Sequence, residues 1–287
     1  MDGESRRSWR NGKTMGLRVN TNVASINAQR NLAGTTQGLQ QSLQRLSSGL
    51  RITRAADDAA GLAISEAFRA DIRSLGQAQR NANDGISLLQ VAEGALDETS
   101  GLLIRQRELA IQAANGSLGA AERDTINNEF QDLSAEISRI AAVTNFNGTQ
   151  VLNTAGTVTF QVGVDNTTND QISVSTVDAT AGTLGVSGQA VSSVSGAQAA
   201  LGAIDSAIAT VASLRASFGT AQNRLESTIR SIAISVENTS AAESRIRDVD
   251  FANETAALTR NQVLQQAGIS VLAQANVSSQ SALSLLG

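Results

Sequence analysis

The adjacent carboxylates Asp57 and Asp58 are residues whose types could do chemistry. A pair of carboxylates serves as general acid and base, or as part of a metal site, when both groups point at one centre. Neighbouring residues on a helix point about 100° apart, because a helix has about 3.6 residues per turn. The chain has no histidine to complete such a site. The two aspartates are therefore predicted to cap a helix, by accepting hydrogen bonds from its free N–H groups.

The side chains on which most enzymes depend are missing from this sequence. It contains no His and no Cys, which excludes the commonest general base, the commonest metal ligand and every thiolate nucleophile. No phosphate-binding G-x-x-x-x-G-K-S/T motif occurs either. The net charge of −4 is too mild to indicate a nucleic-acid partner. We therefore expect a protein that is not an enzyme and that needs no metal or cofactor.

The composition favours long helices. Proline is absent, so no residue fixes φ or removes a backbone donor within a helix. Aromatic residues make up only 2% of the chain, which leaves aliphatic residues to fill a core of packed helices. Apolar residues recur at steps of three, four or seven in three inner segments: Ile64, Phe68, Ile72, Leu75, Ala82, Ile86, Leu89, Leu96 and Leu103; Ile126, Phe130, Leu133, Ile137 and Ile140; Ile204, Ile208, Val211, Leu214, Phe218, Ala221 and Leu225. This spacing predicts a mostly α fold, a long antiparallel coiled-coil or helical-bundle rod.

A different period occurs between residues 157 and 177. The segments TVTFQVG (157–163) and QISVSTV (171–177) alternate β-branched and polar residues, and a polar stretch separates them. Alternation with a period of two is typical of strands, so a small β-hairpin is predicted. Residues 178–200 are rich in Ala, Gly, Ser and Thr without a strong period. We expect this segment to be irregular and variable.

Both ends of the chain carry apolar seams of their own, which predicts paired N- and C-terminal helices. A pair of helices this small is only marginally stable, because it leaves much apolar surface in water. The simplest missing partners are further copies of the same chain. The predicted polymerisation seams are Val23, Ile26, Leu32, Leu39, Leu43 and Leu46 near one end, and Leu258, Leu264 and Val271 near the other.

The stretch LSSGLRITRAADDAAGLAIS (46–65) interrupts the helical pattern. Gly49 stands where the C-terminal cap of one helix is expected, and Asp57 or Asp58 where the next helix would be capped. Arg51 and Arg54 break the apolar seam between these caps. The stretch is therefore predicted to connect a terminal coiled coil to a separate rod-shaped bundle.

The sequence offers no obvious route across a membrane. No apolar run reaches the roughly 18 residues that a membrane-spanning helix needs, so no membrane span is expected. Residues 1–14 carry charges but lack the apolar h-region of a signal peptide, so they do not indicate a cleavable secretory signal. If the protein leaves the cell, another route must carry it.

The connector and five further motifs follow one another in a fixed order. They are LSSGLRITRAADDAAGLAIS (46–65), RNANDGISLLQVAEGAL (80–96), RELAIQAANG (107–116), TNFNGTQVL (144–152), ENTSAAESRIRDVDFANE (237–254) and QAGISVLAQAN (266–276). In order and spacing these motifs resemble the bacterial flagellins, over most of residues 16–153 and 200–287. Few residues separate the two matching halves, so the chain is similar to a short form without the large outer domains.

The resemblance implies a structural subunit that polymerises into the bacterial flagellar filament for motility. It also implies the division of the chain. The expected parts are an extension outside the family match (1–14), the N-terminal helix and connector of an inner terminal domain (15–57), the long helices of a rod domain (58–153), the β-hairpin and variable segment (154–200), the return helix of the rod (201–247) and the C-terminal helix of the inner domain (248–287).

The resemblance further implies partners and a location. The subunit would be exported through the flagellar secretion apparatus and reside outside the cell, in the filament. Its partners would be further copies of itself, a flagellar export chaperone at the C-terminal helix, and hook-associated and cap proteins.

Three residues carry a recognition role in this family. Positions matching Arg105, Leu109 and Glu129 contact Toll-like receptor 5 of animal hosts, so a shared surface of cation, apolar side chain and carboxylate is expected. The alternative is a surface salt bridge beside one residue of the seam. Gln106 replaces the small apolar residue usual in this block, which is a departure from the family pattern.

Two other functions remain open at this stage. A hook–filament junction protein shares the terminal helices, although rarely the whole set of central motifs. A flagellin-like binding protein of the cell surface would reuse the same fold for a different purpose.

Overall fold

The computed structural model describes residues 21–284, with side chains described from residue 21 to residue 277. These residues form two compact units. The terminal unit consists of residues 21–66 and 243–284, and the central unit consists of residues 67–242. Residues 1–14, which we expected to lie outside the family fold, are not among the described residues.

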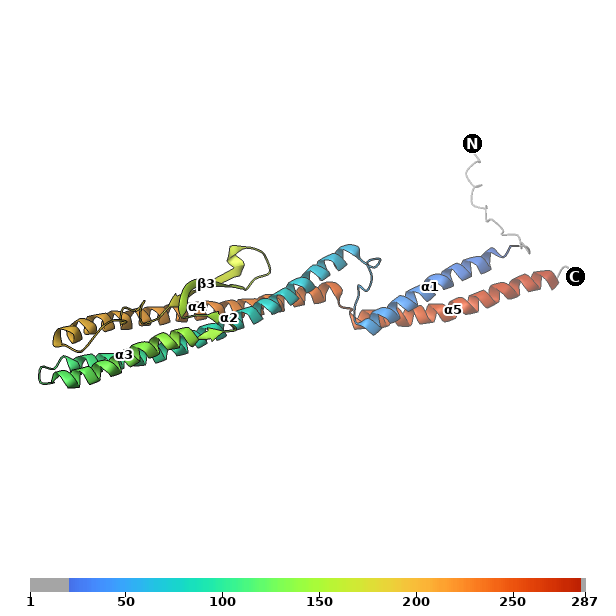
Figure 1. Ribbon diagram of the computed structural model, residues 1–287. Coiled ribbons are helices and arrows are strands. Elements are labelled where there is room, and N and C mark those ends of the chain that lie inside the picture. Colours follow the sequence, from blue (N-terminus) through green and yellow to red (C-terminus); the bar gives the residue numbers. More distant parts are fainter. Residues whose placement is uncertain (1–20, 285–287) are drawn as a thin grey trace, which may run out of the picture. The chain divides into compact units, whose positions relative to one another are not determined.

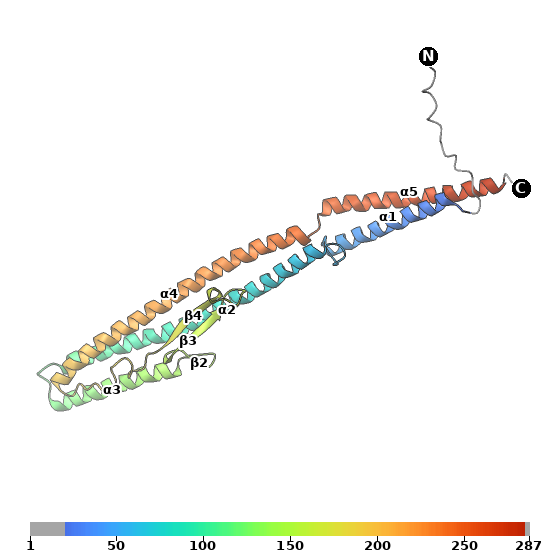
Figure 2. The same cartoon turned by 90° about the horizontal axis from the view of Figure 1, so that it is seen from above.

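The terminal unit is built on two antiparallel helices, α1 (Val23–Ser48) and α5 (Phe251–Ser284), which lie side by side in Figure 1 and Figure 2. The side chain of Asn22 caps α1 by accepting from the Ser25 N–H at 3.0 Å. Gly49 ends the helix with φ at +73°, a left-handed conformation that glycine adopts without a Cβ penalty. The predicted paired terminal helices and the glycine cap are confirmed.

The central unit contains most of α2 (Ala59–Ala113), all of α3 (Ala120–Val143) and most of α4 (Val194–Arg247). Helix α3 runs back along α2 after the turn at residues 114–119. Helix α4 is also antiparallel to α2, because Asp205 pairs with Arg107 while Arg215 pairs with Asp97 further back along α2. The predicted antiparallel helical bundle is confirmed.

Most of the predicted inner seams form the core of the central unit, whereas Ile64, which belongs to the terminal unit, is 48% exposed. Helix α2 contributes Leu89, Leu96 and Leu103, each no more than 1% exposed. Phe130 and Ile137 of α3 and Ile204 and Leu225 of α4 are 0% exposed and belong to the same cluster. The spacing of three and four residues thus brings one apolar stripe from each helix to a common centre.

The predicted β-hairpin is formed by β3 (Asn153–Gln161) and β4 (Gln171–Asp178), with a short 3-10 helix (Thr168–Asp170) in its loop. The strands are antiparallel, with Val158 opposite Val174. The hairpin rests on α2, where Asn81 Nδ2 donates to the Gln161 carbonyl oxygen at 2.9 Å. A Cβ on Gly85 would come within 3.3 Å of the Phe160 ring, so this glycine allows a close approach.

A second, smaller hairpin was not predicted. Strand β1 (Asn145–Phe146) pairs with β2 (Thr149–Gln150) across a two-residue turn. Asn147 and Gly148 in this turn have φ of +49° and +81°. An Asn-Gly turn with two positive φ values is the strongest short hairpin signal, but strands of two residues are too short to show alternation.

Residues 179–193 are irregular as expected, but they pack against the bundle. Ala181, Val186 and Val191 in this segment are no more than 1% exposed. The Val191 N–H donates to Asn127 Oδ1 of α3 at 2.9 Å, which ties the segment to that helix. The return helix α4 then begins at Val194 rather than near residue 201, because the Ala-rich start of the helix also packs into the core.

Helix α4 corrects the expectation that no segment is apolar enough to span a membrane. It alone among the helices of residues 21–284 contains an 18-residue window with a mean hydropathy of 1.3, of which 28% is buried. The same helix carries Asp205 and Arg215, which form ion pairs with α2. A core helix of a bundle meets the same test, so the window is weak support for a membrane span.

Candidate self-association site

The face on which α1 and α5 meet is made of small and polar residues. Ser25, Ala28 and Ser42 are the buried residues of α1. A Cβ on Gly38 would come within 3.1 Å of Asn261 Nδ2 on α5, so the helices approach closely here. Asn22 Nδ2 donates to the Ala275 carbonyl oxygen at 2.9 Å at one end of the pair. The pairing therefore uses close packing more than large apolar side chains.

The predicted polymerisation seams divide between two faces. Leu32, Leu39, Leu46 and Leu258 are half-buried. The other five members of the seams are exposed by 46 to 57%: Val23, Ile26, Leu43, Leu264 and Val271. The monomer thus leaves about half of the predicted seam in water.

Helix α5 exposes further large apolar side chains that the seam did not include. Val263, Ile269 and Val277 are exposed by 59, 54 and 52%. Val263 and Ile269 lie between the seam residues and Val277 lies beyond them, so α5 presents apolar side chains on most of its faces instead of one stripe. A helix that is apolar all round is normally buried on all sides. Burying one such half-exposed side chain stabilises an assembly by roughly 1 kcal/mol.

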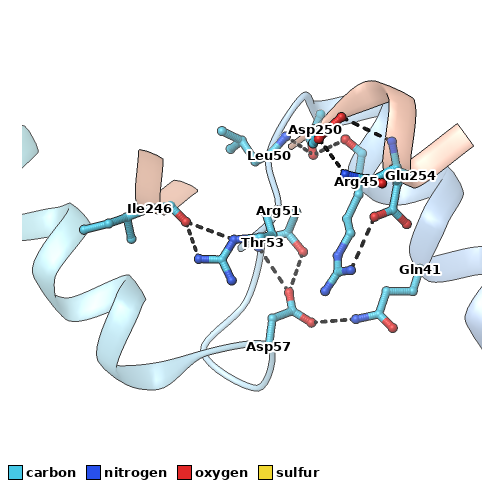
Figure 3. Close-up of polar contacts among 11 residues, drawn as sticks. Gln41, Arg45, Leu50, Arg51, Thr53, Asp57, Ile246, Asp250 and Glu254 are labelled. Carbon is cyan, nitrogen blue, oxygen red and sulfur yellow. Dashed lines mark hydrogen bonds and ion pairs between the residues drawn. The ribbon is translucent and has the colours of Figure 1, made fainter. Parts of the chain in front are cut away.

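The connector between α1 and α2 is hydrogen-bonded to the segment between α4 and α5. The Arg51 N–H donates to the Arg247 carbonyl oxygen at 2.7 Å, and the Val249 N–H donates to the Gly49 carbonyl oxygen at 3.0 Å. The Arg51 guanidinium also donates to the Ile246 carbonyl oxygen near the end of α4, with Nε at 3.1 Å (Figure 3). Arg51 therefore caps α4 from a segment 195 residues away in sequence.

The two adjacent aspartates have separate structural roles. Asp57 Oδ2 accepts from the Thr53 N–H at 3.1 Å, the Thr53 hydroxyl at 2.9 Å and the Arg54 N–H at 3.0 Å. These hydrogen bonds, chiefly that from the Thr53 backbone, lower the pKa of Asp57. Asp58 Oδ1 accepts from the Gly61 N–H at 2.8 Å in the first turn of α2. The capping prediction is confirmed, with Asp58 as the cap and Asp57 as the organiser of the loop.

Two ion pairs flank this connector. Arg45 of α1 lies 3.5 Å from Glu254 of α5, and Arg247 lies 2.8 Å from Glu66. Gln41 Nε2 donates to Asp57 Oδ1 at 3.2 Å, which ties the loop back to α1 (Figure 3). These contacts join residues that are 16 to 209 positions apart, so local sequence patterns do not predict them.

The residues expected to contact a receptor are only partly brought together. Arg105 lies 2.8 Å from Glu129 and 2.9 Å from Glu108, and the three side chains are about half-exposed. These two acceptors raise the pKa of the Arg105 guanidinium, with Glu129 as the larger cause. Leu109 is 1% exposed and belongs to the core. The expected surface therefore holds the ion pair without the leucine, because position 109 is turned from Arg105 towards the neighbouring helices.

The part of the chain that the structure describes contains no group of three His, Cys, Asp or Glu side chains able to hold a metal ion. An open groove of about 500 Å³ lies beside the hairpin and is lined by residues such as Leu75, Ile172 and Arg224. It holds one carboxylate, Asp170, which accepts from the Thr167 hydroxyl at 2.6 Å. The exposed apolar side chains of α1 and α5 are therefore the stronger candidate for a functional surface.

Comparison with known families places both halves of the chain. The family model of the bacterial flagellin N-terminal helical region matches residues 19–157, and that of the C-terminal helical region matches residues 201–286. The chain is 45% identical over 269 residues to a flagellin of Halalkalibacterium halodurans, which covers 93% of this chain and 99% of the relative. It is 42% identical over 305 residues to a flagellin of Bacillus subtilis, covering 94% and 100%.

The chain is also similar to a filament protein and to solved structures. It is 43% identical over 283 residues to the flagellar filament 33 kDa core protein of Treponema phagedenis, covering 93% of this chain and 99% of the relative. A Bacillus cereus flagellin structure has a TM-score of 0.47 and 32% identity, covering 53% of this chain and 88% of that one. A protein described as hook-associated from Vibrio parahaemolyticus has a TM-score of 0.56 and 16% identity, covering 67% and 100%.

Proposed function

This chain belongs to the bacterial flagellin family, and on that premise we propose how its parts build a filament. It is a structural subunit of the flagellar filament, similar over nearly its whole length to flagellins and to a filament core protein. We propose that residues 15–57 and 248–287 form an inner assembly layer. Residues 58–153 and 201–247 would form the rod around it, and residues 154–200 would carry the hairpin.

The observation that supports this proposal is the exposed apolar surface of α5. Val263, Ile269 and Val271 are each more than half exposed, and they lie on different faces of the helix. One partner helix covers only one side of α5, so several neighbours are needed to bury these residues. Copies of the same chain supply them in a helical homopolymer, where one surface of each subunit contacts a different surface of the next.

The proposal extends to the export route and to other partners, which family membership supports. Residues 250–287 would bind an export chaperone before assembly, because an apolar helix without neighbours promotes aggregation. The chain would pass through the flagellar secretion apparatus and polymerise outside the cell. Hook-associated and cap proteins would meet the two ends of the polymer.

Recognition by Toll-like receptor 5 is part of the proposal in a modified form. Arg105 and Glu129 supply an exposed charged pair on the rod. Leu109 would act indirectly, by supporting the helix beneath this pair, because its side chain is buried.

Substitutions on α5 test the assembly proposal. We expect Val263→Ser, Ile269→Ser and Val271→Ser together to raise the critical concentration for polymerisation at least tenfold. Three contacts of roughly 1 kcal/mol each would be lost from every subunit. The measurement is sedimentation of polymer over a range of protein concentrations. The matched control is Gln262→Ser, Gln266→Ser and Gln274→Ser, which changes three exposed polar positions of the same helix. Equal critical concentrations for the two variants would refute the proposal.

A further inference from the structure

The central unit buries one amide side chain within its helical core. Gln106 of α2 is 0% exposed and lies between the buried residues Leu103 and Leu109. Every other buried polar side chain among the described residues is a serine or a threonine. Burial of an amide is unfavourable unless hydrogen bonds replace those made to water. The presence of Gln106 in this core therefore needs a physical reason.

The amide of Gln106 bonds to α3. Its Nε2 donates to the Phe130 carbonyl oxygen at 3.1 Å and to Ser134 Oγ at 2.6 Å. The Ser134 hydroxyl donates to the same Phe130 carbonyl oxygen at 3.2 Å. Gln106 Oε1 is buried without a hydrogen-bond partner. An amide that is satisfied on one side only contributes little net stability, so stability does not explain it.

The other buried hydroxyls of these helices do not link one helix to another. Thr99 of α2 donates to the Ala95 carbonyl oxygen at 2.9 Å, four residues back along its own helix. A hydrogen bond within α2 does not depend on the position of α3 along it. The contact between Gln106 and Ser134 depends on how far α3 is displaced along α2.

The remaining pattern of α3 repeats almost unchanged every seven residues. Its members at this interval are Glu122, Glu129 and Glu136; Ile126, Leu133 and Ile140; and Phe130 and Ile137. A displacement of α3 by one heptad, about 10 Å, would still place a glutamate opposite Arg105. It would return an apolar residue to about half of the inward positions of α3, although in one direction Arg123 would take the place of Phe130. The ion pair therefore does not select one alignment, and the apolar seam selects it only in part.

Ser134 breaks this repeat. The residues seven positions before and after it are Asn127 and Ala141. A displaced α3 would bring one of these to Gln106 and would leave the buried amide without its present partners. Arg123 also links the helices, donating to the Ala113 carbonyl oxygen at 3.0 Å. That contact lies at the turn, where water can replace a lost partner at small cost.

We propose that Gln106 is a positioning residue, whose amide sets the axial register of α3 on α2 through Ser134 and the Phe130 carbonyl. A single polar residue at a core position fixes register in coiled coils at some cost in stability. Register matters in a homopolymer, because every copy must present the same surfaces to its neighbours. The same contact places Arg105 beside Glu129, the residue before Phe130.

The absence of cysteine from the chain makes the register measurable. Three full-length reporters combine Arg105→Cys with Glu122→Cys, Glu129→Cys or Glu136→Cys, and a short bifunctional thiol reagent joins only neighbouring thiols. In the parent background we expect cross-linking of the pair 105/129 alone. With Gln106→Leu and Ser134→Ala added, we expect the slipped pairs 105/122 or 105/136 to cross-link at least tenfold more than in the parent.

Circular dichroism melts and a control variant complete the test. The Gln106→Leu/Ser134→Ala chain is expected to keep its helical signal and to melt at the parent temperature or above. Thr99→Val removes a buried hydroxyl that bonds within its own helix, so it should keep the single register. A single 105/129 product in the Gln106→Leu/Ser134→Ala chain, or equal slippage in Thr99→Val, would overturn the proposal. Loss of helix in both that chain and Gln106→Met would also overturn it, by showing that the amide is needed for folding itself.

Discussion

Replacement of Asp57 by alanine should loosen the connector without unfolding the helices on either side. The substitution removes the acceptor of four hydrogen bonds, from the Thr53 N–H, the Thr53 hydroxyl, the Arg54 N–H and Gln41 Nε2. A buried hydrogen bond to a charged group contributes about 1.5–3 kcal/mol. Asp57 is half-buried and its donors can turn to water, so we expect a total loss of about 1–2 kcal/mol.

Amide hydrogen exchange at Thr53 and Arg54 measures this loss locally. A change of 1–2 kcal/mol corresponds to roughly five- to thirtyfold faster exchange. The same assay reports the protonation of Asp57. Because its folded pKa is lowered, the stabilisation is complete above the ordinary pKa of about 3.9 and is lost as pH falls through the folded value. Corrected for intrinsic rates, protection should be flat from neutral pH to about pH 4 and fall below it.

A control separates the loop from a general effect of acid. Asp250 caps α5 by accepting from the Ala252 and Asn253 N–H groups, and its pKa is also lowered, chiefly by the Asn253 backbone. Asp250→Ala should speed exchange at the start of α5 and leave Thr53 and Arg54 unchanged. Parent-like protection of Thr53 and Arg54 in Asp57→Ala would refute the assignment of Asp57 as organiser of the loop.

The remaining predictions concern two glycines, a buried leucine and an exposed arginine. Gly49→Ala should destabilise α1 by about 1–2 kcal/mol in chemical denaturation followed by circular dichroism, because φ at this cap is +73°. Gly34→Ala lies inside the same helix with open space around the new methyl group, so it should stabilise the helix by about 1 kcal/mol. Stability changes of the same sign in the two glycine variants would contradict this prediction. Leu109→Ala should cost about 2–5 kcal/mol and lower the melting temperature, since the side chain is 1% exposed. Arg105→Ala should leave the melting temperature nearly unchanged and lower potency in a Toll-like receptor 5 reporter assay ten- to a hundredfold; unchanged potency would remove the receptor from the proposal.

Local sequence signals predicted much of the fold. The spacing of Leu96, Phe130 and Ile204 placed three helices around one core, and alternation in residues 171–177 placed a strand. Gly49 marked a helix end because an αL cap favours glycine. These features depend on residues close together in the chain, so periodicity and capping rules are sufficient to find them.

Features that depend on tertiary distance were not predictable in the same way. Arg51 donates to the Ile246 carbonyl oxygen, 195 residues away, and no local pattern around Arg51 predicts that partner. Leu39 and Leu43 belong to one seam, yet Leu39 is half-buried and Leu43 is 50% exposed, because the packing of α1 and α5 decides which side is covered. In the sequence Gln106 was only a departure from the family pattern, and the position of α3 gives its amide two acceptors.

The exposed residues of α5 have a cause that lies outside the single chain. Val263 and Ile269 interrupt a simple seam, so they look like noise in a period of three and four. They make physical sense when α5 is buried on several sides by other copies. A sequence pattern reports the faces that must be covered, and in a polymer some of those faces are covered by neighbours.

Electron microscopy under polymerising salt tests the central claim that the terminal helices drive assembly of this chain. The comparison is between the full chain and a chain of residues 51–250, which lacks α1 and α5 and keeps the buried core of the central unit. The full chain is expected to form filaments, and the shortened chain is expected to remain a cooperatively melting helical monomer. Filaments formed by the shortened chain would contradict the account.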